Sequence, residues 1–129
     1  MTNKTVIMVI EDEDLLLEAI TKKLKISGLD VVACSNGKQA FDFLENLDAK
    51  PDAIWLDYYL GDMDGLNFMQ KINGTKDLSN IPVVVISNSA SPDKVNQMLG
   101  LGAKEYLIKA EHRLDELVKI VSGFAQNKQ

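Results

Sequence analysis

Five short apolar runs, separated by longer segments with helical periodicity, constrain the fold of this chain more than any other feature. β-branched residues are common in the runs, which lie at 5–10, 31–33, 53–56, 81–86 and 105–108. Apolar runs of this length, bounded by turn residues, are typical of buried strands. Strands that alternate with helices predict right-handed β–α–β units and a parallel sheet covered on both faces. We therefore predict an α/β fold with one doubly wound (βα)5 domain and a five-stranded parallel sheet.

The helices are expected where apolar residues recur at helical spacing, at 15–27, 39–47, 66–73, 92 to 100 or 102, and 114–124. Glycine and proline mark several of their ends. Gly28 stands where a helix C′ residue belongs, and Pro92 suits the first turn of the fourth helix. Pro82 is compatible with a strand only near the start of that strand.

Length and charge narrow the class of protein. The 129 residues predict a single domain over 1–129, with a core at about 5–124 and a polar tail at 126–129. A net charge of -5 argues against a nucleic-acid partner and against an anionic membrane surface. Cys34 is the sole cysteine, so neither an intramolecular disulfide nor a cysteine-based zinc site is expected. No segment resembles a signal peptide or reaches a transmembrane length. We expect a cytoplasmic protein.

The stretch from Pro51 to Gly65 carries the first indication of chemistry. Its apolar run ends abruptly at Asp57, which a buried parallel strand would deliver to its carboxyl end. Ligands of open α/β sheets bind at that end. The other strands deliver further polar side chains to the same edge: Glu11, Asp12, Ser87 and Lys109.

Three carboxylates at one edge repel each other unless a proton or a cation compensates. Lys109 supplies a single positive charge, which does not neutralise three carboxylates, so a bound divalent cation is expected. Mg²⁺ suits a site made of a few carboxylates, a backbone carbonyl and water. A carboxylate beside Mg²⁺ and a lysine can accept a phosphoryl group, because both cations stabilise the transferring oxygens.

With these residues in place, the chain resembles the receiver domain of two-component response regulators. The resemblance extends over about 5–124, and its matching segments are 9–13, 51–57, 62–65, 85–87, 102–106 and 107–109. It implies a flavodoxin-like strand order of 2-1-3-4-5 and a phosphoacceptor switch in a phosphorelay. A histidine kinase or a histidine phosphotransfer protein would be the phosphodonor.

The resemblance also implies a role for each residue at the site. Asp57 is expected to be the phosphoacceptor, and Glu11 and Asp12 to hold Mg²⁺ with Asp57 and the backbone carbonyl of Tyr59. Ser87 and Lys109 are then expected to contact the phosphoryl group, and Tyr106 to change rotamer when Ser87 moves. The fourth helix, fifth strand and fifth helix would form the face that binds a downstream protein, or a second copy of the chain after phosphorylation.

The chain departs from the family pattern in the neighbourhood of this site. Ala110 replaces the usual proline after the conserved lysine, so the bond at Lys109–Ala110 is expected to be trans, or a strained cis bond that aims the lysine. Tyr59 and Asn88 are bulky for their positions, and Gly61 replaces a common proline. Tyr59 is expected to alter the lifetime of the phosphoryl group, in a direction that the sequence does not predict.

Other functions remain open at this point. A pseudo-receiver would keep the fold as an interaction module and would not be phosphorylated. A haloacid-dehalogenase-type phosphatase would need a second Asp where Tyr59 stands, and a flavodoxin-like cofactor binder would need a phosphate-binding loop where residues 11–14 are all acidic. We therefore expect no enzyme with an external substrate, only self-phosphorylation and self-dephosphorylation.

Overall fold

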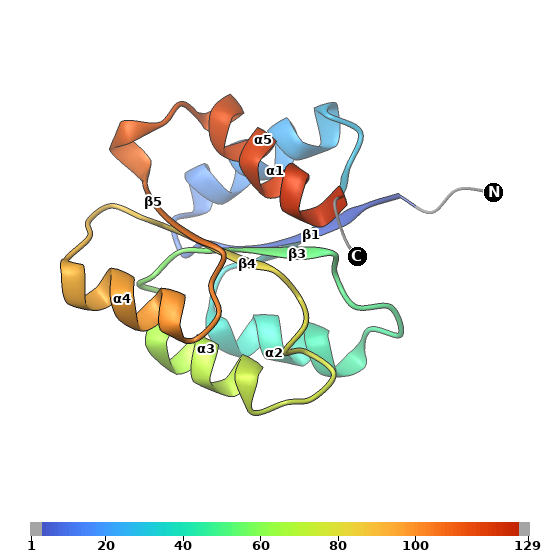
Figure 1. Cartoon of the computed structure of the whole chain (residues 1–129). Helices are drawn as coiled ribbons and strands as arrows, with labels where there is room; N and C mark the ends of the chain where they lie inside the picture. Colours follow the sequence, from blue (N-terminus) through green and yellow to red (C-terminus); the bar gives the residue numbers. More distant parts are fainter. Residues whose placement is uncertain (1–3, 127–129) are drawn as a thin grey trace.

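The computed structural model describes residues 4–126 and has a central sheet between two layers of helices (Figure 1). The strands are β1 (Val6–Ile10), β2 (Asp30–Cys34), β3 (Ala53–Leu56), β4 (Val83–Ser87) and β5 (Glu105–Ile108). They are all parallel and lie in the order β2-β1-β3-β4-β5. The predicted fold class and strand order are confirmed.

The helices alternate with the strands as predicted. They are α1 (Asp14–Ile26), α2 (Gly37–Asn46), α3 (Gly65–Asn73), α4 (Pro92–Gly100) and α5 (Leu114–Gln126), and a short 3-10 turn (Lys109–Glu111) follows β5. Gly28 has a φ of 89°, the left-handed conformation expected of a C′ residue. None of the helices in the described range is long and apolar enough to cross a membrane.

Each face of the sheet has its own core. In Figure 1, α1 and α5 cover one face and α2, α3 and α4 cover the other. Ile7, Val9 and Trp55 pack towards α1 and α5, whereas Met8, Ile10 and Leu56 pack on the opposite side. Successive residues of β1 and β3 are therefore buried on both faces, which explains why these strands read as continuous apolar runs.

Strand boundaries differ slightly from the sequence expectation. The predicted fourth strand began at Ile81, but β4 begins at Val83 and leaves Pro82 outside the ladder. The carbonyl of Pro82 still accepts a hydrogen bond from Ile54 N–H at 2.8 Å, a role that needs no N–H on the proline. The polar tail was predicted to begin at Gln126, but Gln126 is the last residue of α5. The rest of the predicted tail, 127–129, lies outside the described residues.

Candidate functional site

The carboxyl ends of four strands bring the predicted polar residues to one edge of the sheet. Ile10 pairs with Leu56, so Glu11 and Asp57 follow neighbouring strands at the same level. The backbone keeps this alignment one residue further, since Asp57 N–H donates to Ile10 O at 3.0 Å. Ser87 is the last residue of β4, and Lys109 follows β5 directly.

Three carboxylates at this edge could hold one cation. Ligand oxygens of Glu11, Asp12 and Asp57 lie within 4.8 Å of one another. Glu11 and Asp57 are only 1% and 6% exposed, whereas Asp12 is exposed. Buried carboxylates that converge on one point, with one partner reachable from solvent, suit a hard divalent cation such as Mg²⁺ that keeps part of its water shell.

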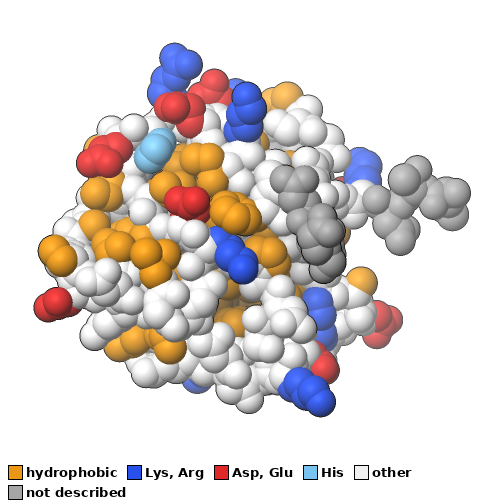
Figure 2. All heavy atoms as spheres, in the orientation of Figure 1, with side chains coloured by type: hydrophobic (Ala, Val, Ile, Leu, Met, Phe, Trp, Pro, Cys, Tyr) orange, Lys and Arg blue, Asp and Glu red, His pale blue; other side chains and the backbone are white. Residues whose placement is uncertain are grey.

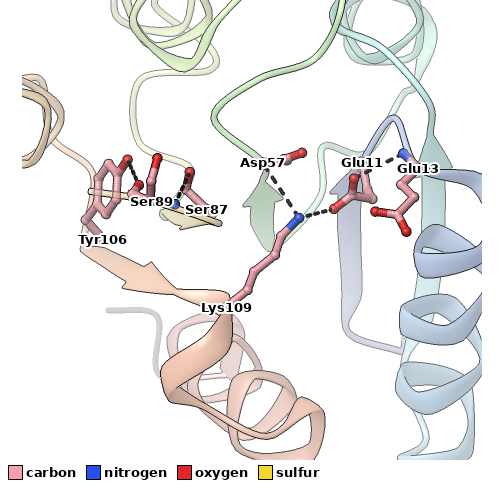
Figure 3. Close-up of polar contacts among 7 residues, drawn as sticks. All are labelled: Glu11, Glu13, Asp57, Ser87, Ser89, Tyr106 and Lys109. Atoms are coloured by element: carbon pink, nitrogen blue, oxygen red, sulfur yellow. Dashed lines mark hydrogen bonds and ion pairs between the residues drawn. The ribbon is translucent and has the colours of Figure 1, made fainter. Parts of the chain in front are cut away.

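Lys109 reaches both buried carboxylates. Its Nζ lies 2.8 Å from Glu11 Oε1 and 3.7 Å from Asp57 Oδ1, as the dashed lines in Figure 3 show. Every peptide bond within residues 4–126 is trans, including the bond between Lys109 and Ala110. Of the two forms expected for this bond, the structure therefore has the trans form, and the lysine still reaches the site. The 3-10 turn at Lys109–Glu111 carries the chain away from the sheet immediately after the lysine.

The same neighbours make Asp57 unusually basic for a carboxylate. Burial and, to a lesser extent, the negative charge of Glu11 together raise the pKa of Asp57 to about 7, against the opposing effect of Lys109. A carboxyl group with this pKa is partly protonated near neutral pH. A cation at the site would favour the ionised form, which is the nucleophilic one.

Ser87 and Tyr106 are connected through the loop after β4. Ser89 N–H donates to Ser87 Oγ at 3.5 Å, and the Tyr106 hydroxyl donates to the carbonyl oxygen of Ser89 at 2.9 Å. Figure 3 shows Tyr106 beside this loop and the Ser87 side chain at the end of its strand. Tyr106 is therefore hydrogen-bonded to the segment that follows Ser87.

Tyr59 lies two residues after Asp57 and has a half-exposed ring. Its hydroxyl contacts the ammonium group of Lys94 from α4, which lies 4.5 Å from the centre of the Tyr59 ring and 4.9 Å from that of Tyr58. The Tyr58 ring is in turn 6.3 Å from that of Tyr106. These contacts connect the loop after β3 to α4 beside the site. Nothing in the sequence indicated Lys94, because one exposed lysine on a helix has no distinguishing pattern.

Asp62 is a second residue to which the sequence assigned no chemistry. Its carboxylate accepts hydrogen bonds from the N–H groups of Gly37 and Lys38, both at 2.9 Å. These donors are at the N-terminus of α2, where negative charge is favoured. Desolvation raises the pKa of Asp62, but the hydrogen bonds from Gly37 and Lys38 outweigh it, so the pKa is lowered overall. Asp62 thereby attaches the loop that follows Asp57 to a helix 25 residues earlier in the chain.

Comparisons with known proteins show which family this chain resembles. Residues 7–122 match the family model described as "Response regulator receiver domain". The chain is 32% identical over 122 residues to the two-component response regulator ORR7 of Oryza sativa subsp. japonica, a match that spans 93% of this chain and 56% of that protein. It is 30% identical to ORR3 of Oryza sativa subsp. indica, spanning 84% of this chain and 87% of that protein.

Solved structures show the same similarity. The phosphorylated cyanobacterial phytochrome response regulator RcpA is 28% identical, with a TM-score of 0.80 and coverage of 94% of this chain and 91% of that one. The Mn²⁺-bound form of response regulator Rcp1 is also 28% identical, with a TM-score of 0.79 and 97% coverage of both chains. A family match across most of the chain, together with the carboxylates, hydroxyl and lysine at one edge of the sheet, shows that this chain belongs to the response regulator receiver domain family.

Proposed function

We propose that this domain is a phosphoacceptor switch in a two-component phosphorelay, in which Asp57 receives a phosphoryl group from a histidine kinase or a histidine phosphotransfer protein. The observation that carries the proposal is the convergence of three carboxylate ligands and one lysine on a single point, with Asp57 in contact with both kinds of group. That arrangement combines a nucleophile with the positive charge that a transferring phosphoryl group requires.

Asp57, Lys109 and Ser87 would each have a separate role in this transfer. A carboxylate oxygen of Asp57 attacks the phosphorus of a phosphohistidine, the phosphorus–nitrogen bond breaks, and the imidazole of the donor leaves. Lys109 is close enough to Asp57 to pair with an oxygen of the new acyl phosphate. The hydroxyl of Ser87, almost fully buried at the end of β4, would donate to another oxygen.

Glu11, Asp12 and Asp57 would hold the cation, with the backbone carbonyl of Tyr59 as a further ligand, and we propose that it is Mg²⁺. Bound there, Mg²⁺ would neutralise charge on the phosphoryl oxygens. The donor set is all oxygen and includes carboxylates, which Mg²⁺ prefers to imidazole or thiolate. The Mn²⁺-bound relative Rcp1 supports a divalent cation without specifying magnesium.

The signal would leave through the face formed by α4, β5 and α5. Figure 2 shows hydrophobic side chains gathered on the face of the molecule where these elements lie. Every residue of the edge strand β5 is partly exposed, and Leu99 of α4 is 43% exposed. Tyr106 on β5 connects this face to the loop after Ser87. A change at Ser87 could therefore alter the surface offered to a downstream protein or to a second copy of the chain.

One observation favours the pseudo-receiver as a second candidate. Lys109 lies nearer to Glu11 than to Asp57, so the site contains an internal ion pair between the lysine and a carboxylate other than the proposed phosphoacceptor. In that case the lysine would serve as a structural counter-ion, and the domain would act as an interaction module.

Intact mass after incubation with acetyl phosphate and Mg²⁺ distinguishes the two functions. The phosphoacceptor gains one phosphoryl adduct, which is absent in Asp57→Asn and after chelation of the metal. Asp93→Asn, which removes an exposed carboxylate on α4, is the matched control and keeps the adduct. A folded protein that gains no adduct from acetyl phosphate or from phosphorylated histidine donors would instead be a pseudo-receiver. In neither case do we expect turnover of an external metabolite.

A further inference from the structure

The loop between β3 and α3 folds into a small hairpin over 59–64. Tyr59 and Asp64 form an antiparallel bridge at its base. One step closer to the tip, the Leu60 N–H donates to the carbonyl oxygen of Met63 at 3.0 Å. Because the backbone carbonyl of Tyr59 is expected to bind the cation, the conformation of this hairpin decides where that ligand lies.

The tip of the hairpin, Gly61 and Asp62, lies beside the proposed cation site. Gly61 has a φ of 81°, a left-handed conformation that glycine adopts at little cost. A Cβ on this glycine would lie 3.9 Å from Oδ2 of Asp12, which is the exposed member of the three carboxylates. Movement of the tip would therefore change the surroundings of Asp12 as well as the position of the Tyr59 carbonyl.

Asp62 fixes this tip to the first turn of α2. Its Oδ1 accepts a hydrogen bond from Gly37 N–H and its Oδ2 accepts one from Lys38 N–H, both at 2.9 Å. The side chain of Met63 lies against the same turn, because a Cβ on Gly37 would come within 2.5 Å of Cε of Met63. The hairpin is thus held to α2 by two hydrogen bonds and a close packing contact.

A second side chain caps the same end of α2 without involving the hairpin. Oδ1 of Asn36 accepts a hydrogen bond from Gln39 N–H at 2.8 Å. Asp62 and Asn36 together bond to three of the N–H groups that helix geometry leaves without a partner inside the helix. Both residues stabilise the start of α2, but only Asp62 connects it to the hairpin, so the pair separates capping from positioning.

We infer that Asp62 is a positioning residue of the cation site: by holding the hairpin against α2, it keeps the Tyr59 carbonyl and Asp12 arranged for a divalent cation. The inference rests on the proposed function, since it concerns the proposed Mg²⁺ site. The role of Asp62 is indirect, because both of its carboxylate oxygens bond to α2. If the hairpin kept the competent arrangement in only about one molecule in ten, the apparent Kd of the cation would rise about tenfold.

Titration of the full chain with Mg²⁺, followed by the fluorescence of Trp55, tests the inference. Asp62→Ala removes both hydrogen bonds and should weaken Mg²⁺ binding about tenfold. Asp62→Asn removes the charge but keeps an oxygen that can accept from both N–H groups, so its affinity should return to within about threefold of the natural protein. Asn36→Ala should lower the free energy of unfolding and leave the affinity for Mg²⁺ unchanged.

A second measurement needs neither metal nor phosphodonor. The Leu60 N–H is bonded within the hairpin, so its exchange with deuterium, followed by NMR in EDTA, reports opening of the hairpin. Exchange should be about tenfold faster in Asp62→Ala, for the same reason that the apparent Kd rises. It should be unchanged in Asn36→Ala.

Two results would overturn the inference alone. The first is an affinity for Mg²⁺ that Asp62→Ala leaves unchanged, or that Asp62→Asn lowers as much as Asp62→Ala, since the charge and not the anchor would then matter. The second is unchanged exchange of the Leu60 N–H in Asp62→Ala, which would show that the hairpin keeps its conformation unaided. A natural protein that binds no Mg²⁺ would instead overturn the cation site of the proposed function, and the role of Asp62 with it.

Discussion

The ammonium group of Lys109 lies closer to Glu11 than to Asp57, at 2.8 Å from Glu11 Oε1 and 3.7 Å from Asp57 Oδ1. Glu11 is also one of the three residues whose oxygens could hold a cation. Lys109 and a bound divalent metal ion would therefore compete for the same carboxylates. The competition would end once a phosphoryl group supplies new negative charge. Lys109 would then oppose metal binding before transfer and stabilise the product afterwards.

Replacement of Lys109 should separate these two effects. We expect Lys109→Met to bind Mg²⁺ about three- to tenfold more tightly, because removal of one nearby charge is worth on the order of 1 kcal/mol after solvent screening. The same variant should lose most of its phosphorylation by acetyl phosphate. Fluorescence of Trp55, two residues before Asp57, can follow the Mg²⁺ titration.

Lys104→Met is the matched control, since Lys104 is exposed and precedes β5 instead of following it. This variant should leave both the affinity for Mg²⁺ and the phosphorylation unchanged. Weaker Mg²⁺ binding in Lys109→Met would contradict the competition, because it would mean that the lysine organises the carboxylates for the metal.

The raised pKa of Asp57, at about 7 with burial as the main cause, predicts how stability depends on pH without metal. Between the usual pKa of an unfolded Asp, about 4, and this value, the folded state holds more protons than the unfolded state. The free energy of unfolding should therefore fall as pH rises from about 4 to about 7, by on the order of 3 kcal/mol from this group.

Asp57→Asn removes this contribution and provides the comparison. Urea unfolding at several pH values in the presence of EDTA should show that the variant gains stability over the natural protein as pH rises. The difference should shrink when Mg²⁺ is added, because the cation compensates the buried charge. A constant difference between pH 4 and pH 8 would show that Asp57 does not titrate in this range.

The sequence was sufficient to predict that the site residues lie close together, because parallel strands end at the same edge of a sheet. Once five strands were assigned, Glu11, Asp57, Ser87 and Lys109 had to lie near one another. The sequence could not show which carboxylate the lysine would contact, since that depends on how the chain leaves β5. The 3-10 turn there was not predicted.

Long-range partners on the surface were also beyond prediction. Asp62 bonds to N–H groups at the start of α2, and Lys94 contacts Tyr59 across the loop after β3. In each case the side chain reaches an element far away in sequence, and only the packed structure shows which element is near. Turn acids and exposed lysines are common, so their residue type carried no signal.

Cys34 is expected to be unreactive in the native state. It is fully buried at the end of β2, and burial raises the pKa of its thiol to about 12. The thiolate is the reactive form, so its population at pH 8 is very small. Labelling by iodoacetamide, read as intact mass, should proceed only through unfolding and should become fast in urea. Rapid labelling of the folded protein would reveal local opening of the β2 edge of the sheet.

Two glycines provide a matched test of packing around the site. A Cβ at Gly65, the first residue of α3, would lie 2.8 Å from Cδ2 of Tyr58 and 3.0 Å from Cε of Met98. Met98 has a flexible end, but the buried ring of Tyr58 would have to move, so Gly65→Ala should destabilise the protein by about 1–3 kcal/mol. Displacement of the Tyr58 ring should also disturb the contact between that ring and the ammonium group of Lys94.

Gly123 is the converse case, because a Cβ there meets no atom within 4 Å and the residue lies inside α5. Gly123→Ala should stabilise the protein by about 0.5–1 kcal/mol, the difference between alanine and glycine in a helix interior. Denaturant unfolding of both variants measures the opposite signs directly. If Gly65→Ala were as stable as the natural protein, Tyr58 would have room to shift. The aromatic contacts between the loop after β3 and α4 would then be adjustable instead of fixed by packing.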